Sequence, residues 1–129
     1  MKADASDLKG VRVFLVEDES LIMMLLEDIL LDLGCEVAGS ALTLKAALEG
    51  AGSADATVAI CDINLGGEPS FPVAERLQTR GIPVIFASGY GAAALPPAWQ
   101  GCPTLPKPFS GDQVAEVLCR ALAEGAKPR

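Results

Sequence analysis

Four apolar segments of this chain each end in a polar side chain that could handle a phosphoryl group. The polar residues at these ends are an acid pair, a lone aspartate, a hydroxyl and a lysine: Glu17 and Asp18, Asp62, Ser88 and Lys107. In an open α/β sheet, residues at the carboxyl ends of parallel strands converge on one site. Together these residue types meet the needs of one reaction, the reversible phosphorylation of an aspartate assisted by a divalent metal.

The segments that must position these side chains alternate between strand-like and helix-like patterns. Strands are predicted over five ranges: 11–16, 35–40, 57–62, 82–87 and a short one near 102–105. Helices are predicted over four ranges: Ser20–Leu33, Thr43–Ala51, Phe71–Thr79 and Gly111–Glu124. The alternation predicts an α/β fold in which helices cover both faces of a five-stranded parallel sheet, with right-handed crossovers.

Local details of this pattern carry their own predictions. The i, i+3/i+4 spacing in the first helix predicts a buried face formed by Leu21, Met24, Leu25, Ile29 and Leu33. Residues 64–70 predict a turn. Between residues 89 and 101, two successive prolines cannot lie inside a regular helix, so the helix there is predicted to be short or broken. Met23 and Met24 are interpreted as core filler, and Trp99 as a buried or partly buried side chain that could alternatively anchor an interface.

The composition limits the classes of function. At 129 residues, half of them hydrophobic, the chain is long enough for one domain with a sizeable core. The formal net charge of −7 argues against a nucleic-acid binder, whose affinity depends on basic residues that neutralise phosphates. No histidine is present, so no mechanism can use a histidine base, nucleophile or metal ligand of this chain, and the carboxylates are the candidate ligands for Mg²⁺, Mn²⁺ or Ca²⁺.

The cysteines and the termini suggest where the protein works. The four cysteines form no CxxC pair and are interpreted as free thiols in a reducing compartment: Cys35, Cys61, Cys102 and Cys119. The first ten residues lack the apolar stretch of a signal peptide, and the longest apolar run is too short to cross a bilayer. We expect a soluble cytoplasmic protein with an N-terminal extension at 1–9, one domain at 10–124 and a frayed tail at 125–129.

The polar motifs resemble a known phosphorylation site. Glu17-Asp18, Asp62, Ser88 and Lys107-Pro108-Phe109 are similar, in order and in spacing, to the site of two-component response-regulator receiver domains. Each motif alone is weak, but the resemblance covers essentially the whole chain and involves the ends of four strands. It implies a flavodoxin-like receiver fold with strand order 2-1-3-4-5, an order that strand content alone does not determine.

The resemblance implies a role for each acid of the site. Asp62 would be the phospho-acceptor. The ligands of a bound Mg²⁺, for which Mn²⁺ or Ca²⁺ could substitute, would be Glu17, Asp18, Asp62 and the backbone carbonyl of Asn64. Clustered carboxylates repel one another unless a divalent ion neutralises them, so metal binding is favoured over a merely solvated acidic helix start.

The resemblance also implies roles for the lysine and the serine. Lys107 would pair with Asp62 at rest and with the phosphoryl oxygens after transfer. The Lys107–Pro108 bond is expected to be cis, as is common in the family. Ser88 would donate a hydrogen bond to the new phosphoryl group.

Two positions depart from the commonest receiver pattern. Gly89 stands where an alanine usually follows the switch hydroxyl, and Thr104 stands where an aromatic usually precedes the lysine by three residues. Residues 86–91 (FASGYG) instead look like the Phe-Ala-Thr-Gly-Tyr motif of single-domain alphaproteobacterial receivers. Tyr90, next to Gly89, would then take part in switching, and Asn64 and Tyr90 would control water access during dephosphorylation. The alternative for Tyr90 is an ordinary surface side chain.

The function expected from these residues is that of a stand-alone receiver. It would accept a phosphoryl group from a sensor histidine kinase or a histidine phosphotransfer protein and signal to a downstream protein. It would catalyse only its own phosphorylation and dephosphorylation, and would bind neither nucleic acid nor membrane. The face formed by residues 89–101, the strand near 102–105 and helix 111–124 would change on phosphorylation and could support a homodimer.

Three alternatives remain open at this point. The first is a phosphorylation-independent interaction module on the same fold. The second is an aspartyl phosphatase, which Asn64 disfavours because such enzymes usually need an aspartate at that place. The third concerns the chain itself, which could be a piece of a longer protein.

Overall fold

The fold is a parallel sheet between two layers of helices. The computed structural model describes residues 8–89 and 95–125. The sheet contains five parallel strands: β1 (Arg12–Val16), β2 (Glu36–Ala41), β3 (Val58–Asp62), β6 (Val84–Ser88) and β7 (Thr104–Pro106). Their spatial order is β2-β1-β3-β6-β7, which confirms the expected order 2-1-3-4-5 when these five strands are counted along the chain.

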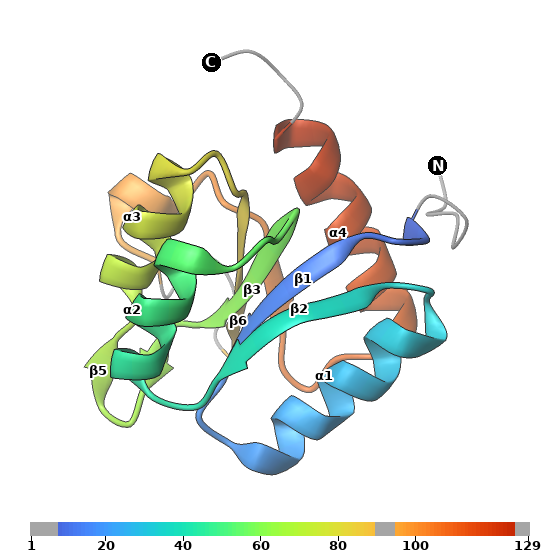
Figure 1. Ribbon diagram of the computed structural model, residues 1–129, viewed down its shortest axis with the longest axis horizontal. Coiled ribbons are helices and arrows are strands. Elements are labelled where there is room, and N and C mark those ends of the chain that lie inside the picture. The colour runs from blue at the N-terminus through green and yellow to red at the C-terminus, as the bar shows by residue number, and fades with distance from the viewer. Residues whose placement is uncertain (1–7, 90–94, 126–129) are drawn as a thin grey trace.

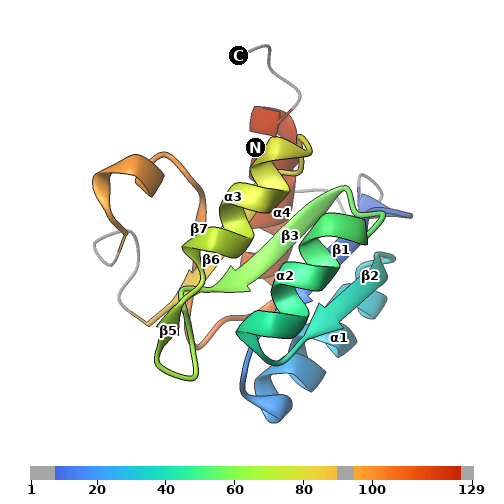
Figure 2. The same ribbon diagram turned by 60° about the vertical axis from the view of Figure 1, so that its left-hand side comes forward.

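Four α-helices of the described residues cover this sheet: α1 (Ser20–Asp32), α2 (Leu44–Ser53), α3 (Phe71–Thr79) and α4 (Gly111–Gly125). Figure 1 and Figure 2 show α1 and α4 on one face and α2 and α3 on the other. The helix boundaries follow local sequence, since the Thr43 side chain accepts a hydrogen bond from the Ala46 N–H (3.1 Å) at the start of α2. Among the described helices, none is long and apolar enough to cross a membrane.

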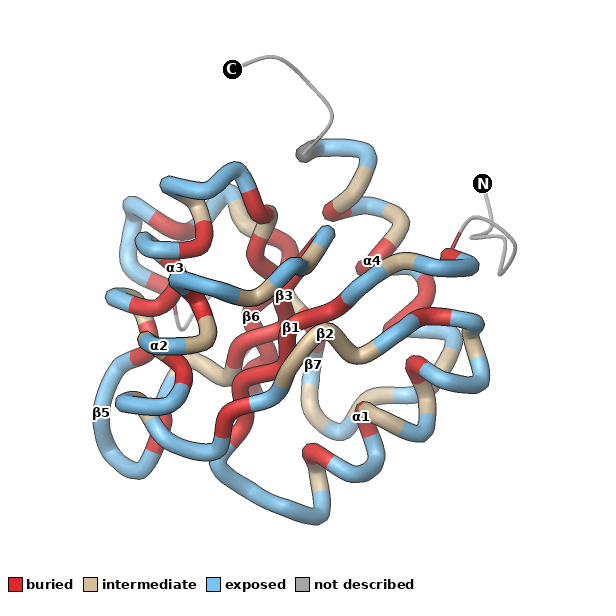
Figure 3. The backbone as a smooth tube through the Cα atoms, viewed as in Figure 1, coloured by how far each residue is buried: buried red, intermediate tan, exposed pale blue. Residues whose placement is uncertain are grey.

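Two apolar layers, one on each side of the sheet, hold these elements together. Leu15, Leu30 and Leu118 belong to the layer under α1 and α4, and Phe14 and Phe86 belong to the layer under α2 and α3. In Figure 3 the central strands are almost continuously buried, whereas the helices alternate between buried and exposed residues. This is the pattern expected of strands that are covered on both faces.

The buried face of α1 differs from the prediction. Met23, Leu26 and Leu30 are buried, whereas four apolar residues of the helix are exposed: Leu21, Met24, Leu25 and Leu31. The first two turns of α1 are apolar almost all round, so spacing alone does not identify the stripe that faces the sheet. The interpretation as core filler therefore holds for Met23 and is wrong for Met24.

Two connections are more structured, or shorter, than the sequence indicates. The segment predicted as a turn contains a small antiparallel hairpin, β4 (Asn64–Leu65) and β5 (Glu68–Pro69). The last strand, β7, begins at Thr104 and not near residue 102, because Pro103 has no N–H to contribute to the sheet.

The segment between residues 89 and 101 has one short helical turn in its described part. This is the 3₁₀ turn η3 (Pro97–Trp99), which agrees with the predicted short or broken helix. Trp99 is buried, as predicted, and its ring centroid lies 5.6 Å from that of Phe86 and 6.0 Å from that of Phe71. These aromatic contacts attach η3 to β6 and to the start of α3.

Arg76 of α3 and Arg80, the residue after α3, donate hydrogen bonds to backbone carbonyls of α2 and of the residue that follows it. Arg80 donates from Nη1 to the Ala51 carbonyl and from Nη2 to the Ala54 carbonyl, each at 2.8 Å, whereas Arg76 donates to one carbonyl (2.9 Å). The Ala51 carbonyl is one of the last four of α2, which lack intrahelical partners, whereas the Leu48 carbonyl that accepts from Arg76 lies further inside the helix. We expect Arg80→Ala to lower the free energy of unfolding by about 1 kcal/mol, measured by urea unfolding. Arg76→Ala should cost less, and an equal or larger loss in that variant would contradict the assignment.

Candidate functional site

The carboxyl ends of four neighbouring strands meet at one edge of the sheet. Because β1, β3, β6 and β7 are adjacent and parallel, they all end on the same side. The predicted site residues lie at these ends: Glu17 and Asp18 after β1, Asp62 at the end of β3, Ser88 at the end of β6, and Lys107 after β7. Parallel pairing thus brings together side chains as far apart in sequence as 90 positions.

Three carboxylates form a cluster at this edge. Glu17, Asp18 and Asp62 each offer an oxygen, and these oxygens lie within 4.8 Å of one another. Glu17 is only 1% exposed, Asp62 is partly buried and Asp18 is exposed. The cluster therefore faces solvent on the Asp18 side, which is where a cation could enter.

Lys107 lies between the buried glutamate and the aspartate. Its Nζ donates a hydrogen bond to Glu17 Oε1 at 2.8 Å and to Asp62 Oδ2 at 3.2 Å. The Lys107–Pro108 peptide bond is cis, and the Lys107 backbone N–H donates to the Ser88 carbonyl at 3.1 Å. The sequence pointed to Asp62 as the partner of this lysine, and the structure adds Glu17 as a second and closer one.

For both Glu17 and Lys107, burial and the neighbouring charge of opposite sign shift the pKa in opposite directions. Burial raises the pKa of Glu17, although hydrogen bonds from Lys107 and from the Glu19 N–H (3.1 Å) lower it in part. Burial alone would lower the pKa of Lys107, but the hydrogen bond to Glu17 and the charge of Asp62 outweigh it and leave that pKa raised. A lysine with a raised pKa keeps its positive charge at neutral pH, where it can stabilise phosphoryl oxygens.

The hairpin β4–β5 contacts the cluster through a backbone group. The Gly66 N–H donates a hydrogen bond to Asp18 Oδ2 at 2.9 Å. Sequence reasoning missed this contact because it predicts only a turn there, although a Gly-Gly pair is the usual signal for a two-residue hairpin. Asn64, whose backbone carbonyl is the fourth predicted ligand, is the first residue of β4 and is exposed.

The hydroxyl and the switch positions are only partly described. Ser88 is the last residue of β6 and is buried, and Gly89 follows it and is exposed. Tyr90 lies outside the described residues, so its role stays a prediction. Thr104, which stands in place of the usual aromatic, pairs in register with Phe86 on β6.

The donor set of the cluster suits a hard divalent cation. Carboxylate and carbonyl oxygens are the ligands that Mg²⁺ and Ca²⁺ prefer in proteins. Three carboxylates share the site with one lysine, so the group keeps a net negative charge when all three are ionised. Mutual repulsion among the carboxylates would be relieved by a bound cation.

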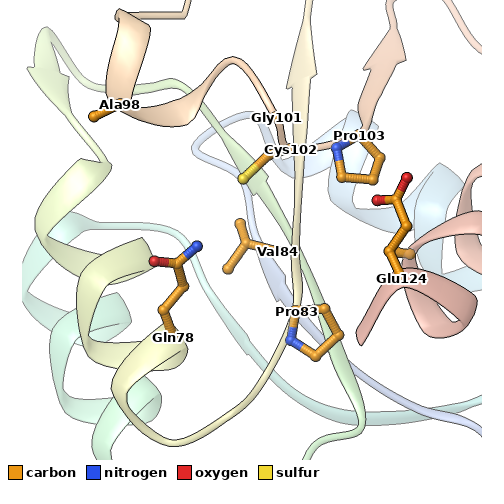
Figure 4. Close-up of a pocket in the computed structure, with 9 residues that line it drawn as sticks. Gln78, Pro83, Val84, Ala98, Gly101, Cys102, Pro103 and Glu124 are labelled. Atoms are coloured by element: carbon orange, nitrogen blue, oxygen red, sulfur yellow. The ribbon is translucent and has the colours of Figure 1, made fainter. Parts of the chain in front are cut away.

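A separate cavity of about 220 Å³ lies at the amino ends of β6 and β7, away from this cluster. Figure 4 shows Val84 between the side chain of Gln78 at the end of α3 and that of Glu124 near the end of α4. None of the predicted site residues lines this cavity. The chemistry described above therefore belongs to the carboxyl edge of the sheet alone.

An open parallel α/β sheet with acids, a hydroxyl and a lysine at its carboxyl edge defines a doubly wound protein suited to handling a phosphoryl group. The family model described as response regulator receiver domain matches residues 13–118. The chain therefore belongs to the response regulator receiver domain family, a signalling module of two-component systems. No curated protein sequence matches the chain.

Solved receiver structures share this fold. The receiver domain of PhyR from Erythrobacter litoralis has a TM-score of 0.82 and 28% identity over 95% of this chain and 98% of that one. SdrG from Sphingomonas melonis Fr1 has a TM-score of 0.78 and 40% identity over 88% and 97%. PhyR from Brucella abortus has a TM-score of 0.77 and 30% identity over 93% of this chain but 51% of its own, so this chain spans about half of that protein.

A similar structure is also known in an activated state. The BeF3-activated conformation of SdrG from Pseudomonas melonis Fr1 has a TM-score of 0.75 and 40% identity over 88% of this chain and 98% of that one.

Proposed function

We propose that this receiver accepts a phosphoryl group on Asp62 from the phosphohistidine of a sensor histidine kinase or a histidine phosphotransfer protein. The observation that carries the proposal is the position of Asp62. One of its carboxylate oxygens lies within 4.8 Å of oxygens of Glu17 and Asp18, and its Oδ2 lies 3.2 Å from Lys107 Nζ. A carboxylate becomes an effective nucleophile when cationic groups orient it and neutralise the incoming phosphoryl oxygens. The chain contains no histidine, so the donor must supply that residue.

The transfer step uses one carboxylate oxygen of Asp62. This oxygen attacks phosphorus, the bond between phosphorus and the donor imidazole nitrogen breaks, and its electron pair stays on that nitrogen. The leaving nitrogen takes up one proton from solvent, so the products are an acyl phosphate on Asp62 and a neutral imidazole on the donor. Lys107 and Ser88 stabilise the phosphoryl oxygens, Lys107 by charge and Ser88 by donating its hydroxyl hydrogen. In hydrolysis, water attacks the same phosphorus, the bond between phosphorus and the Asp62 oxygen breaks, and inorganic phosphate and a proton are released with the free carboxylate.

The acid cluster is the proposed Mg²⁺ site, with Mn²⁺ or Ca²⁺ as possible substitutes. Its ligands are Glu17, Asp18, Asp62 and the backbone carbonyl of Asn64, and their oxygen chemistry supports this assignment. A bound divalent cation supplies positive charge that offsets the three carboxylates and the phosphoryl oxygens. Glu17 has a second task in the metal-free protein, because it holds Lys107 Nζ at 2.8 Å beside the acceptor.

The output of the proposed function is a protein-interaction face formed by η3, β7 and α4. Phosphorylation adds negative charge beside Ser88, at the end of β6. Phe86 of the same strand packs against Trp99 of η3, with the two ring centroids 5.6 Å apart. We assign Tyr90 to this switch as well, with Asn64 and Tyr90 controlling the access of water. SdrG, 40% identical over 88% of this chain, is known in a BeF3-activated conformation. In the proposed mechanism, a downstream protein or a second copy would bind the altered face.

Intact mass spectrometry tests the acceptor directly. The wild-type protein is incubated with phosphoramidate or acetyl phosphate and Mg²⁺, and we expect one phosphoryl increment that a chelator prevents. Asp62→Ala should show no increment, whereas Asp55→Ala should behave as wild type because Asp55 is exposed and pairs with Arg12 (2.9 Å) outside the cluster. An unmodified wild type that is folded and binds Mg²⁺ would point instead to a phosphorylation-independent interaction module.

A further inference from the structure

The hairpin β4–β5 has a conformation that its sequence imposes. Leu65 pairs with Glu68, so the connection consists of the two residues Gly66 and Gly67. Their φ angles are +58° and +91°, and a two-residue turn with positive φ at both positions is the type I′ turn that matches the twist of a hairpin. Glycine reaches such angles without steric cost, so the tip of the hairpin has a defined geometry.

The hairpin is also anchored at its base. Leu65 is buried in the apolar layer under α2 and α3, and the Ser70 N–H donates to the Ile63 carbonyl at 2.8 Å. Hydrogen-bonded and non-hydrogen-bonded pairs alternate in an antiparallel hairpin, and Asn64–Pro69 is the non-hydrogen-bonded pair next to Ile63–Ser70. The pairing therefore fixes the backbone at Asn64, while the Asn64 carbonyl oxygen points away from β5 and stays available.

The tip of the anchored hairpin forms a hydrogen bond with Asp18, the acid that follows β1. The Gly66 N–H donates to Asp18 Oδ2 at 2.9 Å, across 48 positions of sequence. Asp18 is the exposed member of the cluster, so little else from the surrounding core restricts its side chain. A hydrogen bond to a carboxylate oxygen limits rotation of the carboxylate and is stronger than one between neutral groups.

We propose that the β4–β5 hairpin is a positioning element for the cation site, in which the Gly66 N–H orients the Asp18 carboxylate. This inference rests on the proposed function, because it assumes that the acid cluster binds Mg²⁺. Partners that orient metal ligands from outside the coordination sphere commonly change metal affinity by ten- to a hundredfold. The hairpin thus links two proposed ligands, Asn64 of β4 and Asp18, which follows β1.

Mg²⁺ titration calorimetry of the metal-free full chain tests this role with two substitutions at one position. Gly66→Pro removes the N–H and forces φ to a negative value, and we expect it to weaken Mg²⁺ binding about tenfold. Gly66→Asn keeps the N–H, and asparagine tolerates a φ of +58° in a place with no atom within 4 Å of its Cβ. Gly66→Asn should therefore bind Mg²⁺ as the wild type does.

The outcomes separate the inference from the proposed function. A wild type that does not bind Mg²⁺ would contradict the proposed function itself. Equal affinities for wild type and Gly66→Pro would overturn the positioning role while leaving the cation site intact. An amide spectrum gives a second test that does not depend on Gly66→Pro: in the metal-free protein, Asp18→Asn should shift the Gly66 N–H resonance, and an unchanged resonance would also overturn the role.

Discussion

Replacing Lys107 by methionine is expected to lower the unfolding free energy of the metal-free protein by about 3 kcal/mol at pH 7. Methionine keeps the apolar stem of the side chain and removes its charge. Glu17, which is 1% exposed, then loses the cation 2.8 Å from its Oε1 and remains beside Asp62. Breaking one half of a buried pair is costly because the remaining charge is neither solvated nor compensated.

The pH dependence of this loss identifies its cause. The pKa of Glu17 is raised above 4.5, so its contribution to wild-type stability grows as pH falls through the raised value and is complete below 4.5. The pKa of Lys107 is raised above 10.5, so its contribution is present below 10.5 and is lost as pH rises through the raised value. Without Lys107, Glu17 takes up a proton more readily, and the difference between variant and wild type should narrow from pH 7 towards pH 4.5.

Urea unfolding in the presence of a chelator, repeated across this pH range, measures the effect. Lys45→Met is the matched control, because Lys45 is exposed on α2 and its loss should change stability by less than about 0.5 kcal/mol. A deficit for Lys107→Met that stays constant from pH 7 to pH 4.5 would mean that lost packing, and not the ion pair, causes it. The same variant should also lose most of its phosphorylation by phosphoramidate, because Lys107 is a proposed ligand of the phosphoryl oxygens.

That the site residues lie together could be predicted, because it depends only on which polar residues directly follow the apolar runs. Each polar site residue follows an apolar run, and parallel strands necessarily place such ends on one edge. The order of the strands came from the family resemblance and is confirmed by the structure. The Glu17–Lys107 contact could not be predicted, since a difference between 2.8 Å and 3.2 Å depends on side-chain geometry that residue spacing does not determine.

Sequence reasoning missed the buried face of α1 and the β4–β5 hairpin for different physical reasons. Helix α1 carries apolar residues on both its buried and its exposed sides, so which side faces the sheet depends on how the connecting loops orient the helix. The hairpin at residues 64–69 depends on pairing between two-residue strands that are too short to show a periodicity. For α1, tertiary contacts decide between alternatives that the local pattern leaves equal, whereas for the hairpin the Gly66-Gly67 pair was a local signal that could have been used.

The close approach of α2 to β1 leads to a second large effect, at Gly50. A Cβ atom at this position would lie 2.6 Å from Cζ and 2.7 Å from Cε1 of Phe14. The Phe14 ring is buried and has little room to move away, because the ring also lies close to Gly39 on β2, where a Cβ would be 3.3 Å from Cδ1. The ring therefore fills a space bounded by two residues that have no side chain.

Gly50→Ala is expected to lower the unfolding free energy by about 2 kcal/mol, although alanine is the better helix former by about 1 kcal/mol. The overlap with a confined ring outweighs the gain in helix propensity. Gly52→Ala in the same helix should have the opposite sign and stabilise by up to about 1 kcal/mol, because the nearest atom, Arg76 Cδ, is 3.9 Å from that Cβ. Urea unfolding of the two variants makes the comparison.

The assignment of the Gly50 effect to the Phe14 ring can be tested with a double variant. Phe14→Leu leaves a smaller side chain under α2, so the further loss caused by Gly50→Ala should be less in that background than in the wild type. If the losses of unfolding free energy caused by the two substitutions are additive, the Phe14 ring is not the cause of the Gly50→Ala effect. The same conclusion follows if Gly50→Ala stabilises the protein as Gly52→Ala does. A smaller loss from Gly50→Ala in the Phe14→Leu background would show that the missing side chain at position 50 is what allows α2 to lie close to β1, the strand that leads directly into Glu17 and Asp18.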